Sequence, residues 1–207
     1  GLFSGFIAEV TSTATPSTTI APISDMPTIA SPDEPYTSEA TIDLVVTIPP
    51  NMVGRDETRV RIYLMLPDQV AAQVEERSVG TGPRVVIPIA LTPGENGFSA
   101  TIATPGGESE SSPIVTFILD QEAPAIVLSS PAENATINRD VVTLVGKTQA
   151  RSTLVARNEA NGASNAGEAG PDGSFELVLA IAAGPNGIQI TATDPAGLTD
   201  TGRTVIV

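Results

Sequence analysis

The sequence predicts an all-β protein built from two tandem antiparallel β-sandwiches that follow an extended N-terminal arm. Three observations lead to this fold class. An internal repeat covers much of the 207 residues, apolar and polar residues alternate with a period of two, and Gly and Pro number 18 each. Alternation is typical of strands with one buried face, and frequent Gly and Pro suit the turns between short strands. No helical periodicity persists for ten residues.

The repeat aligns residues 83–117 with residues 173–207 at a constant offset of 90, without a gap. Core-facing positions recur by type, since residues 85, 87, 89 and 91 are apolar and so are their counterparts at 175, 177, 179 and 181. The same holds for residues 98, 100 and 102. Several positions recur by identity, namely Gly94, Asn96, Gly97, Thr101, Pro105, Gly107 and Val115, which match Gly184, Asn186, Gly187, Thr191, Pro195, Gly197 and Val205.

A Gly-x-Asn-Gly motif separates two consecutive strands in each copy. Gly and Asn tolerate a positive φ, so we expect Asn96-Gly97 and Asn186-Gly187 to form equivalent tight turns between consecutive antiparallel strands. A positive φ at Gly187 would make its replacement by Val cost on the order of 1 kcal/mol or more.

The remaining strands are predicted from alternation and flanking turns. In the first copy they cover residues 41–48, 59–65 and 114–119, and in the second copy residues 140–147, 151–157 and 204–207. The front halves repeat more loosely, around Ser31-Pro32 and Ser130-Pro131. The copies differ in the middle, where residues 66–79 could add an edge strand, whereas residues 158–170 read as loop.

The predicted organisation is an arm over residues 1–26, a first sandwich over 27–120 and a second sandwich over 121–207. Residues 11–24 contain eight Ser or Thr, two Pro and no charge, which is typical of an extended linker outside the cytoplasm. We expect Leu2, Phe3, Phe6 and Ile7 to anchor the arm by inserting into a membrane or a partner. The arm could instead add a strand to a neighbouring copy. Because residue 1 is Gly, we expect a processed product or a fragment.

The second copy resembles a bacterial Ig-like domain of the type grouped with domain B of glucodextranase. The resemblance is carried by Ala123-Pro124-Ala125-Ile126, Ser130-Pro131, Val145-Gly146-Lys147-Thr148, Gly173-Ser174-Phe175, Gly184-Pro185-Asn186-Gly187-Ile188 and Thr193-Asp194-Pro195-Ala196-Gly197. It covers residues 121–207, and the first copy lacks the Asp of the last motif. The resemblance implies two Ig-like sandwiches in an exported, cell-surface or wall-facing protein, where such modules serve as spacers, scaffolds or docking surfaces.

Composition excludes several function classes. The chain has no Cys, His or Trp, which removes disulfides, thiol nucleophiles, His-based triads and zinc sites built on Cys or His. Its formal net charge of −14 disfavours nucleic acid as a partner. Paired carboxylates occur at Asp33-Glu34, at Glu75-Glu76 and at Glu108 with Glu110, but they lie in polar contexts that would not raise a pKa for acid catalysis. We therefore predict no catalytic residue and no cofactor.

Two ligand classes remain open. Asp120 and Glu122 link the copies, and their carboxylates suit calcium at a domain junction. A short charged linker explains the same residues. A glycan site would need aromatic platforms, and the candidates are few: Tyr63 sits in a strand between Ile62 and Leu64, so one of its faces is expected in the core.

These observations predict a non-catalytic, extracytoplasmic structural protein, on the cell surface or the periplasmic side. It would be a subunit or ectodomain that spaces, docks or stabilises a larger membrane or surface assembly. Its partners would be proteins, and its N-terminal arm would provide membrane contact. The alternative function is a ligand-binding Ig-like module for a glycan or calcium.

Overall fold

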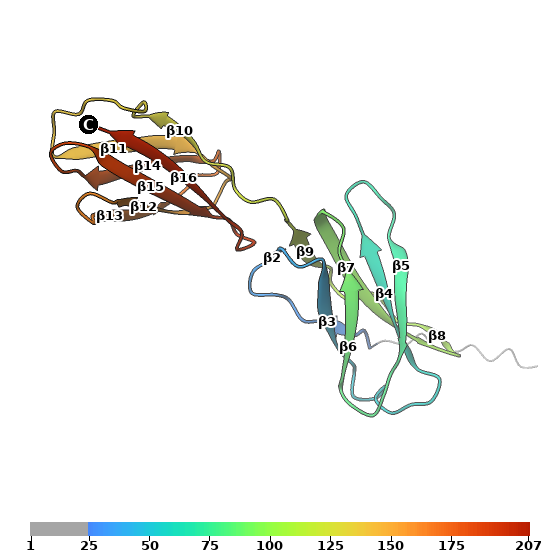
Figure 1. The fold of residues 1–207 in the computed structure, drawn as a ribbon. Coiled ribbons are helices and arrows are strands. Elements are labelled where there is room, and N and C mark those ends of the chain that lie inside the picture. The colour runs from blue at the N-terminus through green and yellow to red at the C-terminus, as the bar shows by residue number, and fades with distance from the viewer. Residues whose placement is uncertain (1–24) are drawn as a thin grey trace, which may run out of the picture.

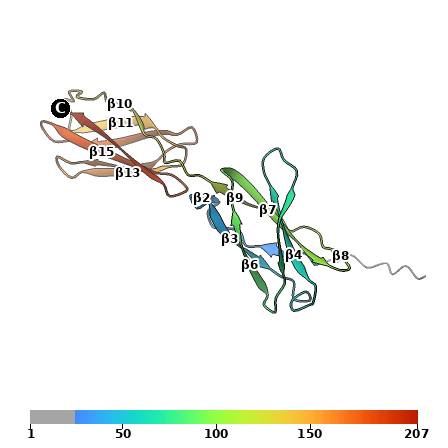
Figure 2. The same ribbon diagram turned by 45° about the vertical axis from the view of Figure 1, so that its right-hand side comes forward.

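The computed structural model describes residues 25–207, in which sixteen strands form four sheets and no residue is helical. The sheets pack in pairs as two sandwiches that lie end to end along an extended molecule (Figure 1). A second view, turned by 45°, shows the same end-to-end arrangement (Figure 2). The prediction of an all-β protein with two tandem sandwiches is confirmed, while the boundaries 27–120 and 121–207 stay predictions.

The first sandwich pairs a three-stranded sheet with a six-stranded one. The smaller sheet has the order β1-β3-β6, and the larger one has the order β2-β9-β7-β4-β5, with β8 also paired to β7. All pairs are antiparallel except β2 with β9. The bounds are β1 Thr28–Ile29, β2 Tyr36–Thr37, β3 Thr41–Thr47, β4 Arg59–Met65, β5 Ala72–Ser78, β6 Arg84–Ala90, β7 Gly94–Thr104, β8 Gly107–Glu108 and β9 Val115–Leu119.

The second sandwich repeats this topology. A three-stranded sheet β10-β11-β14 faces a four-stranded sheet β13-β12-β15-β16, in the same order as β1-β3-β6 and β5-β4-β7-β9, while β2 and β8 have no counterpart. The bounds are β10 Val127–Ser130, β11 Val141–Lys147, β12 Thr153–Asn158, β13 Ser164–Glu168, β14 Ser174–Ala180, β15 Asn186–Thr193 and β16 Thr199–Ile206. The equal topology confirms the internal repeat.

Each sandwich has its own apolar core, formed by the alternating residues that the sequence predicts. In β7 the inward residues Phe98, Ala100 and Ile102 are fully buried, and their counterparts Ile188, Ile190 and Ala192 fill the second core. The two core clusters share no residue. Each sheet pair therefore buries enough apolar surface to form an independent hydrophobic unit.

The Gly-x-Asn-Gly motif does not form the tight turn that the sequence predicts. β6 and β7 belong to different sheets, so the motif carries the chain across the sandwich, and β14 and β15 are related in the same way. The positive φ values lie at Gly94 and Gly184, at 88° and 87°, and not at Gly187. The loss of stability that a positive φ would cause on replacement by Val is therefore expected at Gly184 and not at Gly187.

The Asn of each motif holds this crossover together. Asn186 is 1% exposed, its Oδ1 accepts hydrogen bonds from the Ala182 N–H at 2.8 Å and from Asn158 Nδ2 at 2.8 Å, and its Nδ2 donates to the carbonyls of Ala182 and Gly184. Asn96 bonds Thr92 and Gly94 in the same manner. A single buried side chain thus bonds several backbone groups of the crossover loop and fixes its conformation.

The offset of 90 fails in the last strand of the repeat. Phe98 pairs with Val115 in the first copy, whereas its counterpart Ile188 pairs with Thr204 in the second. The structural equivalent of Val115 is therefore Thr204, which is 8% exposed like Val115, and Val205 faces outward. The hairpin loop is one residue longer in the first copy, and a shift of one residue turns each side chain to the opposite face.

The middle of the two copies is more alike than the sequence predicts. The edge strand expected within residues 66–79 is β5, which is confirmed. The loop expected over residues 158–170 is wrong, because β13 pairs with β12 as a second edge strand. Its sequence, SNAGE, has no apolar alternation to mark it.

The predicted arm over residues 1–26, with Leu2, Phe3, Phe6 and Ile7, lies almost wholly outside the described residues. Within residues 25–207 the structure contains no helix with the length and apolarity of a membrane span.

Replacing Asn186 with Ala should destabilise the second sandwich by about 3 kcal/mol, because its buried side chain makes four hydrogen bonds that hold the crossover loop and Asn158. Urea denaturation would measure this free energy of unfolding. The matched control is Asn138→Ala, since Asn138 is exposed and makes no side-chain hydrogen bond within the described residues, and it should change stability by less than about 0.5 kcal/mol. Equal stability of the two variants would contradict the role given to Asn186.

Candidate functional site

Asp120, the residue predicted as a junction ligand, lies where the two sandwiches meet. It follows β9, and its N–H donates to the carbonyl of Thr37 at 2.9 Å. Its Oδ1 accepts a hydrogen bond from the Glu122 N–H at 3.1 Å, and its Oδ2 accepts one from Gln149 Nε2 at 2.6 Å. Gln149 belongs to the loop between β11 and β12. The Asp120 carboxylate thus joins the end of the first sandwich to a loop of the second.

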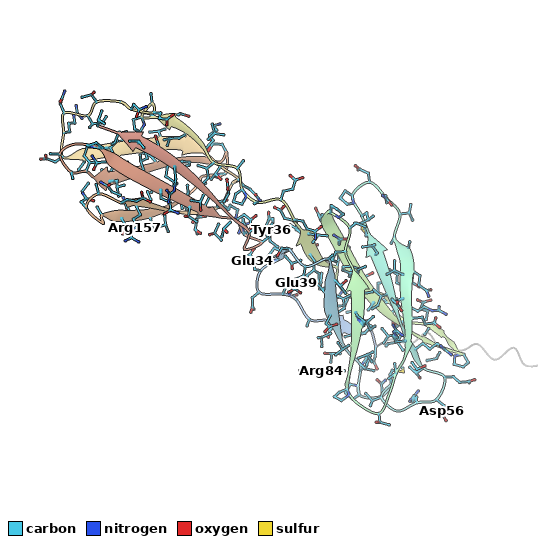
Figure 3. The ribbon with its side chains drawn as sticks, in the orientation of Figure 1. Glu34, Tyr36, Glu39, Asp56, Arg84 and Arg157 are labelled. Atoms are coloured by element: carbon cyan, nitrogen blue, oxygen red, sulfur yellow. The ribbon has the colours of Figure 1, made fainter. Side chains whose placement is uncertain are left out.

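Arg151, in the same β11–β12 loop, makes the other contacts across the junction. Its guanidinium lies 5.4 Å from the ring centroid of Tyr36, and its Nη2 is 3.8 Å from Glu34 Oε1. Figure 3 shows Glu34 and Tyr36 on the side of the first sandwich that faces the second. Arg151 has a φ of 64°, a conformation unusual for a residue with a side chain. We call the contacts of Asp120, Gln149, Arg151, Tyr36 and Glu34 the junction.

The predicted calcium residues border one hollow of about 480 Å³ beside the junction. Asp120 and Glu122 both line it, but so does Lys147, the only lysine of the chain. Within residues 25–207 no three Asp or Glu side chains come together as a metal site would need. A positive charge in the same hollow opposes cation binding. Calcium at Asp120 and Glu122 stays a prediction.

Four of the six paired carboxylates of the sequence have an arginine partner, namely Glu34, Glu75, Glu76 and Glu108. Glu76 contacts Arg61 at 2.8 Å and Arg59 at 3.3 Å, and Glu75 lies 3.6 Å from Arg77. The hydrogen bond from Arg61 holds the pKa of Glu76 below its ordinary value of 4.5. A general acid needs a raised pKa, so this arrangement does not supply one.

A chain of polar contacts runs over the outer face of β4 and ends at Glu108. Arg61 Nη1 donates to Glu108 Oε2 at 2.8 Å, the Tyr63 hydroxyl donates to Oε1 at 2.7 Å, and the Thr101 hydroxyl also donates to Oε1. Partial burial favours the neutral form of Glu108, but hydrogen bonds from Thr101, Tyr63 and Arg61 outweigh it and lower its pKa. We call these residues, with Glu76, the outer-face network.

The position of Tyr63 differs from the expectation that one face of its ring is in the core. Its neighbours Ile62 and Leu64 point inward, whereas Tyr63 stands on the outer face beside Arg61. Glu108 accepts the phenolic hydrogen bond, and this raises the pKa of Tyr63 above its ordinary value of 10.0. The ring is therefore held in place by a carboxylate and not by core packing.

Sequence reasoning missed Gln149, Arg151 and Arg61 as site residues. The strand predicted over residues 151–157 begins at Thr153, so Gln149 and Arg151 both lie in the loop before it, and nothing in the sequence marks what they touch. Arg61 alternates with the buried Val60 and Ile62, so its outward direction could be predicted. Its contact with Glu108 could not, because Glu108 lies 47 residues further along the chain.

Comparison with known proteins agrees with the Ig-like architecture of the second sandwich. Residues 124–207 match the family model described as glucodextranase, domain B. This match confirms the resemblance of the second sandwich to a bacterial Ig-like domain, which its sequence motifs predict.

Most of the chain is similar to a segment of a larger protein and to several solved structures. It is 29% identical over 182 residues to bacillopeptidase F of Bacillus subtilis (strain 168), covering 87% of this chain and 12% of that protein. Fibronectin(III)-like modules of Clostridium thermocellum CbhA align with a TM-score of 0.46 at 15% identity, over 87% of this chain and 93% of that one. The human OSCAR ligand-binding domain aligns with a TM-score of 0.46 at 16% identity, over 87% and 97%.

The outer-face network predicts an acid-sensitive first sandwich. The folded-state pKa values of Glu76 and Glu108 lie below 4.5, so their contribution to stability is present above that pH and is lost as the pH falls through the lower folded-state values. Glu108→Gln should reduce the loss of thermal stability between about pH 7 and pH 3 in the first sandwich.

The matched control is Glu176→Gln, an exposed carboxylate on β14 in the second sandwich, which should leave this pH dependence unchanged. Melting curves at each pH give the comparison. A Glu108→Gln variant that loses stability as steeply as the unmodified chain would contradict the network.

Proposed function

We propose that the chain is a non-catalytic spacer of an extracytoplasmic protein, and that its two sandwiches hold a preferred end-to-end orientation. The junction carries this proposal, because contacts from Asp120 and Arg151 join the β11–β12 loop to the end of the first sandwich. An extended module of this kind separates whatever lies before it from whatever lies after it.

The linker supports a restricted orientation. Only residues 120–126 separate β9 from β10, and Pro124 within them has a fixed φ and is buried. A short linker leaves few relative orientations to begin with, so weak contacts are enough to favour one of them.

A non-catalytic role is supported by the state of the ionisable groups. The chain has no Cys or His, and the carboxylates of Glu76 and Glu108 have lowered pKa values and arginine partners. Similarity to a segment covering 12% of bacillopeptidase F supports an accessory region of a larger exported protein.

The same proposal assigns anchoring to Leu2, Phe3, Phe6 and Ile7, which lie outside the described residues. These apolar side chains would dock on a protein partner or a membrane. The sandwiches would then project from that attachment point into a surface assembly.

Arg151→Ala should broaden the distribution of distances between the sandwiches. Loss of a cation–π contact at an exposed site removes about 1 kcal/mol, which changes the ratio of two orientations by about fivefold. Because the chain has no native Cys, spin labels can be placed at Arg84→Cys and Glu176→Cys and their distance distribution measured by pulsed electron paramagnetic resonance.

Arg157→Ala is the matched control, since Arg157 is exposed on β12 and has no ion pair within the described residues (Figure 3). It should leave the distance distribution unchanged. A broad distribution in the unmodified chain, or no change on Arg151→Ala, would overturn the proposed orientation.

Deleting residues 1–24 should leave both sandwiches folded but release the protein from its membrane or assembly fraction. The two cores use only residues from Ile29 onward, so the deletion removes none of their packing. Fractionation of cells that express each form would measure the release. A variant with Leu2, Phe3, Phe6 and Ile7 all changed to Ser keeps the length of the arm and should behave like the deletion. Unchanged association of both variants would show that the sandwiches themselves make the contact.

A further inference from the structure

A groove of about 590 Å³ runs over the outer face of the six-stranded sheet, between Tyr63 and the segment 109–114. We call it the outer-face groove. Its volume lies within the range of small-molecule sites, and it combines an aromatic ring with hydroxyl groups, one carboxylate and an apolar end. Spacing two sandwiches requires none of these features.

Small residues on β7 make room for the groove. Gly97, Ser99 and Thr101 face outward here, and a Cβ at Gly97 would lie 3.1 Å from Ile114 Cγ2. The segment 109–114 therefore packs close to β7 and forms one wall. Tyr63 on β4, the cross-strand partner of Ser99, forms the opposite wall.

The backbone of β7 offers nothing to a ligand along this wall. The N–H groups of Ala100 and Ile102 donate to the hydroxyls of Ser112 and Ser109, at 3.0 Å and 2.9 Å. The carbonyls of the same two residues accept from the N–H groups of Ser112 and Ser109, each at 2.8 Å. A peptide added as a strand needs free backbone groups at a sheet edge, so this groove does not suit one.

The side chains, in contrast, present polar groups in fixed positions. Glu108 is held by Arg61, Tyr63 and Thr101, and its Oε2 keeps acceptor capacity beyond the single bond from Arg61. The hydroxyls of Ser99 and Ser111 line the groove and make no hydrogen bond within the described residues. These groups can exchange hydrogen bonds with a ligand that carries several hydroxyls.

The other end of the groove is apolar, with Met65, Ala71 and Ile114 beside the Tyr63 ring. A pyranose ring has an apolar face of C–H groups and a rim of hydroxyls, which matches an aromatic wall beside hydrogen-bonding groups. The negative charge around the groove also limits which class of sugar can bind. Glu108 lines the groove and the chain carries a net charge of −14, so an anionic sugar would be repelled.

We propose that the outer-face groove binds a neutral hexopyranose unit of a polysaccharide. The apolar face of the sugar packs on Tyr63, and its hydroxyls bond Glu108, Ser99 and Ser111. The proposal is independent of the spacer role, because the groove lies wholly on the first sandwich.

The test is a titration of the ¹⁵N-labelled full chain with soluble oligosaccharides, followed by amide chemical shifts. The probes are maltohexaose, cellohexaose and fully N-acetylated chitohexaose, which are neutral, and a hexamer of alginate, which is anionic. We expect at least one neutral sugar to shift amides at residues 63, 99–101 and 108–112, and the anionic hexamer to shift none of them.

Tyr63→Ala should weaken binding of that neutral sugar about tenfold, because the stacking surface is lost. Ser111→Ala removes one exposed hydroxyl without touching the outer-face network, so it tests the groove in a chain whose folding is undisturbed, and it should weaken binding by a smaller factor. Glu176→Gln, on the other sandwich, should bind as the unmodified chain does.

The proposal is overturned if no neutral sugar shifts groove amides at millimolar concentration, if the shifts map elsewhere, or if both groove variants bind normally. Arg151→Ala distinguishes this proposal from the spacer role. It should loosen the junction but leave sugar affinity unchanged.

Discussion

Both sandwiches depend on one constraint: the chain must leave one sheet and enter the other with its alternation in phase. Asn96 and Asn186 meet this constraint by bonding the backbone of the crossover loop from inside it. The Asn side chain is buried while the loop around it is largely exposed, and these bonds fix the loop so that the next strand starts with Phe98 or Ile188 pointing into the core. Every later residue of β7 and β15 inherits its face from that start, the inner ones filling the core and the outer ones making the site.

The sequence was informative where local pattern determines structure. Alternation alone identified the inward residues of β7 and β15, and the repeat identified equal topology. Prediction from the sequence failed where the structure of a segment depends on the strand with which it pairs. Identity of Val115 and Val205 suggested equivalence, but hairpin length sets the register, so Thr204 takes the inward position. The edge strand β13 escaped detection because its backbone bonds to β12 stabilise it, and such bonds leave no hydrophobic pattern in SNAGE.

The candidate sites also divide into residues that local sequence could place and residues that only the folded structure brings together. Asp120 was predicted at the boundary between the sandwiches and lies there, since chain order alone places it between the two copies. Its partner Gln149 was not predictable, because the fold of the second sandwich, and not the position of Gln149 along the chain, brings the β11–β12 loop to the junction. Tyr63 and Glu108 meet from strands 45 residues apart, and only the pairing of β4 and β8 with β7 brings them together. The fold class can thus be predicted from the short-range alternation of apolar and polar residues, whereas the sites depend on which residues strand pairing brings together.

The outer-face network and the junction differ in the strength of their contacts, which suits the network to ligand binding and the junction to domain orientation. Glu108 accepts three hydrogen bonds from groups fixed on neighbouring strands, so its position is set before any ligand arrives. The ion pair at the junction is about half exposed and contributes at most about 1 kcal/mol, which is too little to lock two free domains together. It is enough to bias a pair whose linker of residues 120–126 already excludes most orientations. Arg151 adopts a positive φ in that loop, and a strained conformation persists only where its surroundings favour it. The contacts of Arg151 with Tyr36 and Glu34 cross between the sandwiches, so we infer that the loop conformation and the orientation of the domains are energetically coupled.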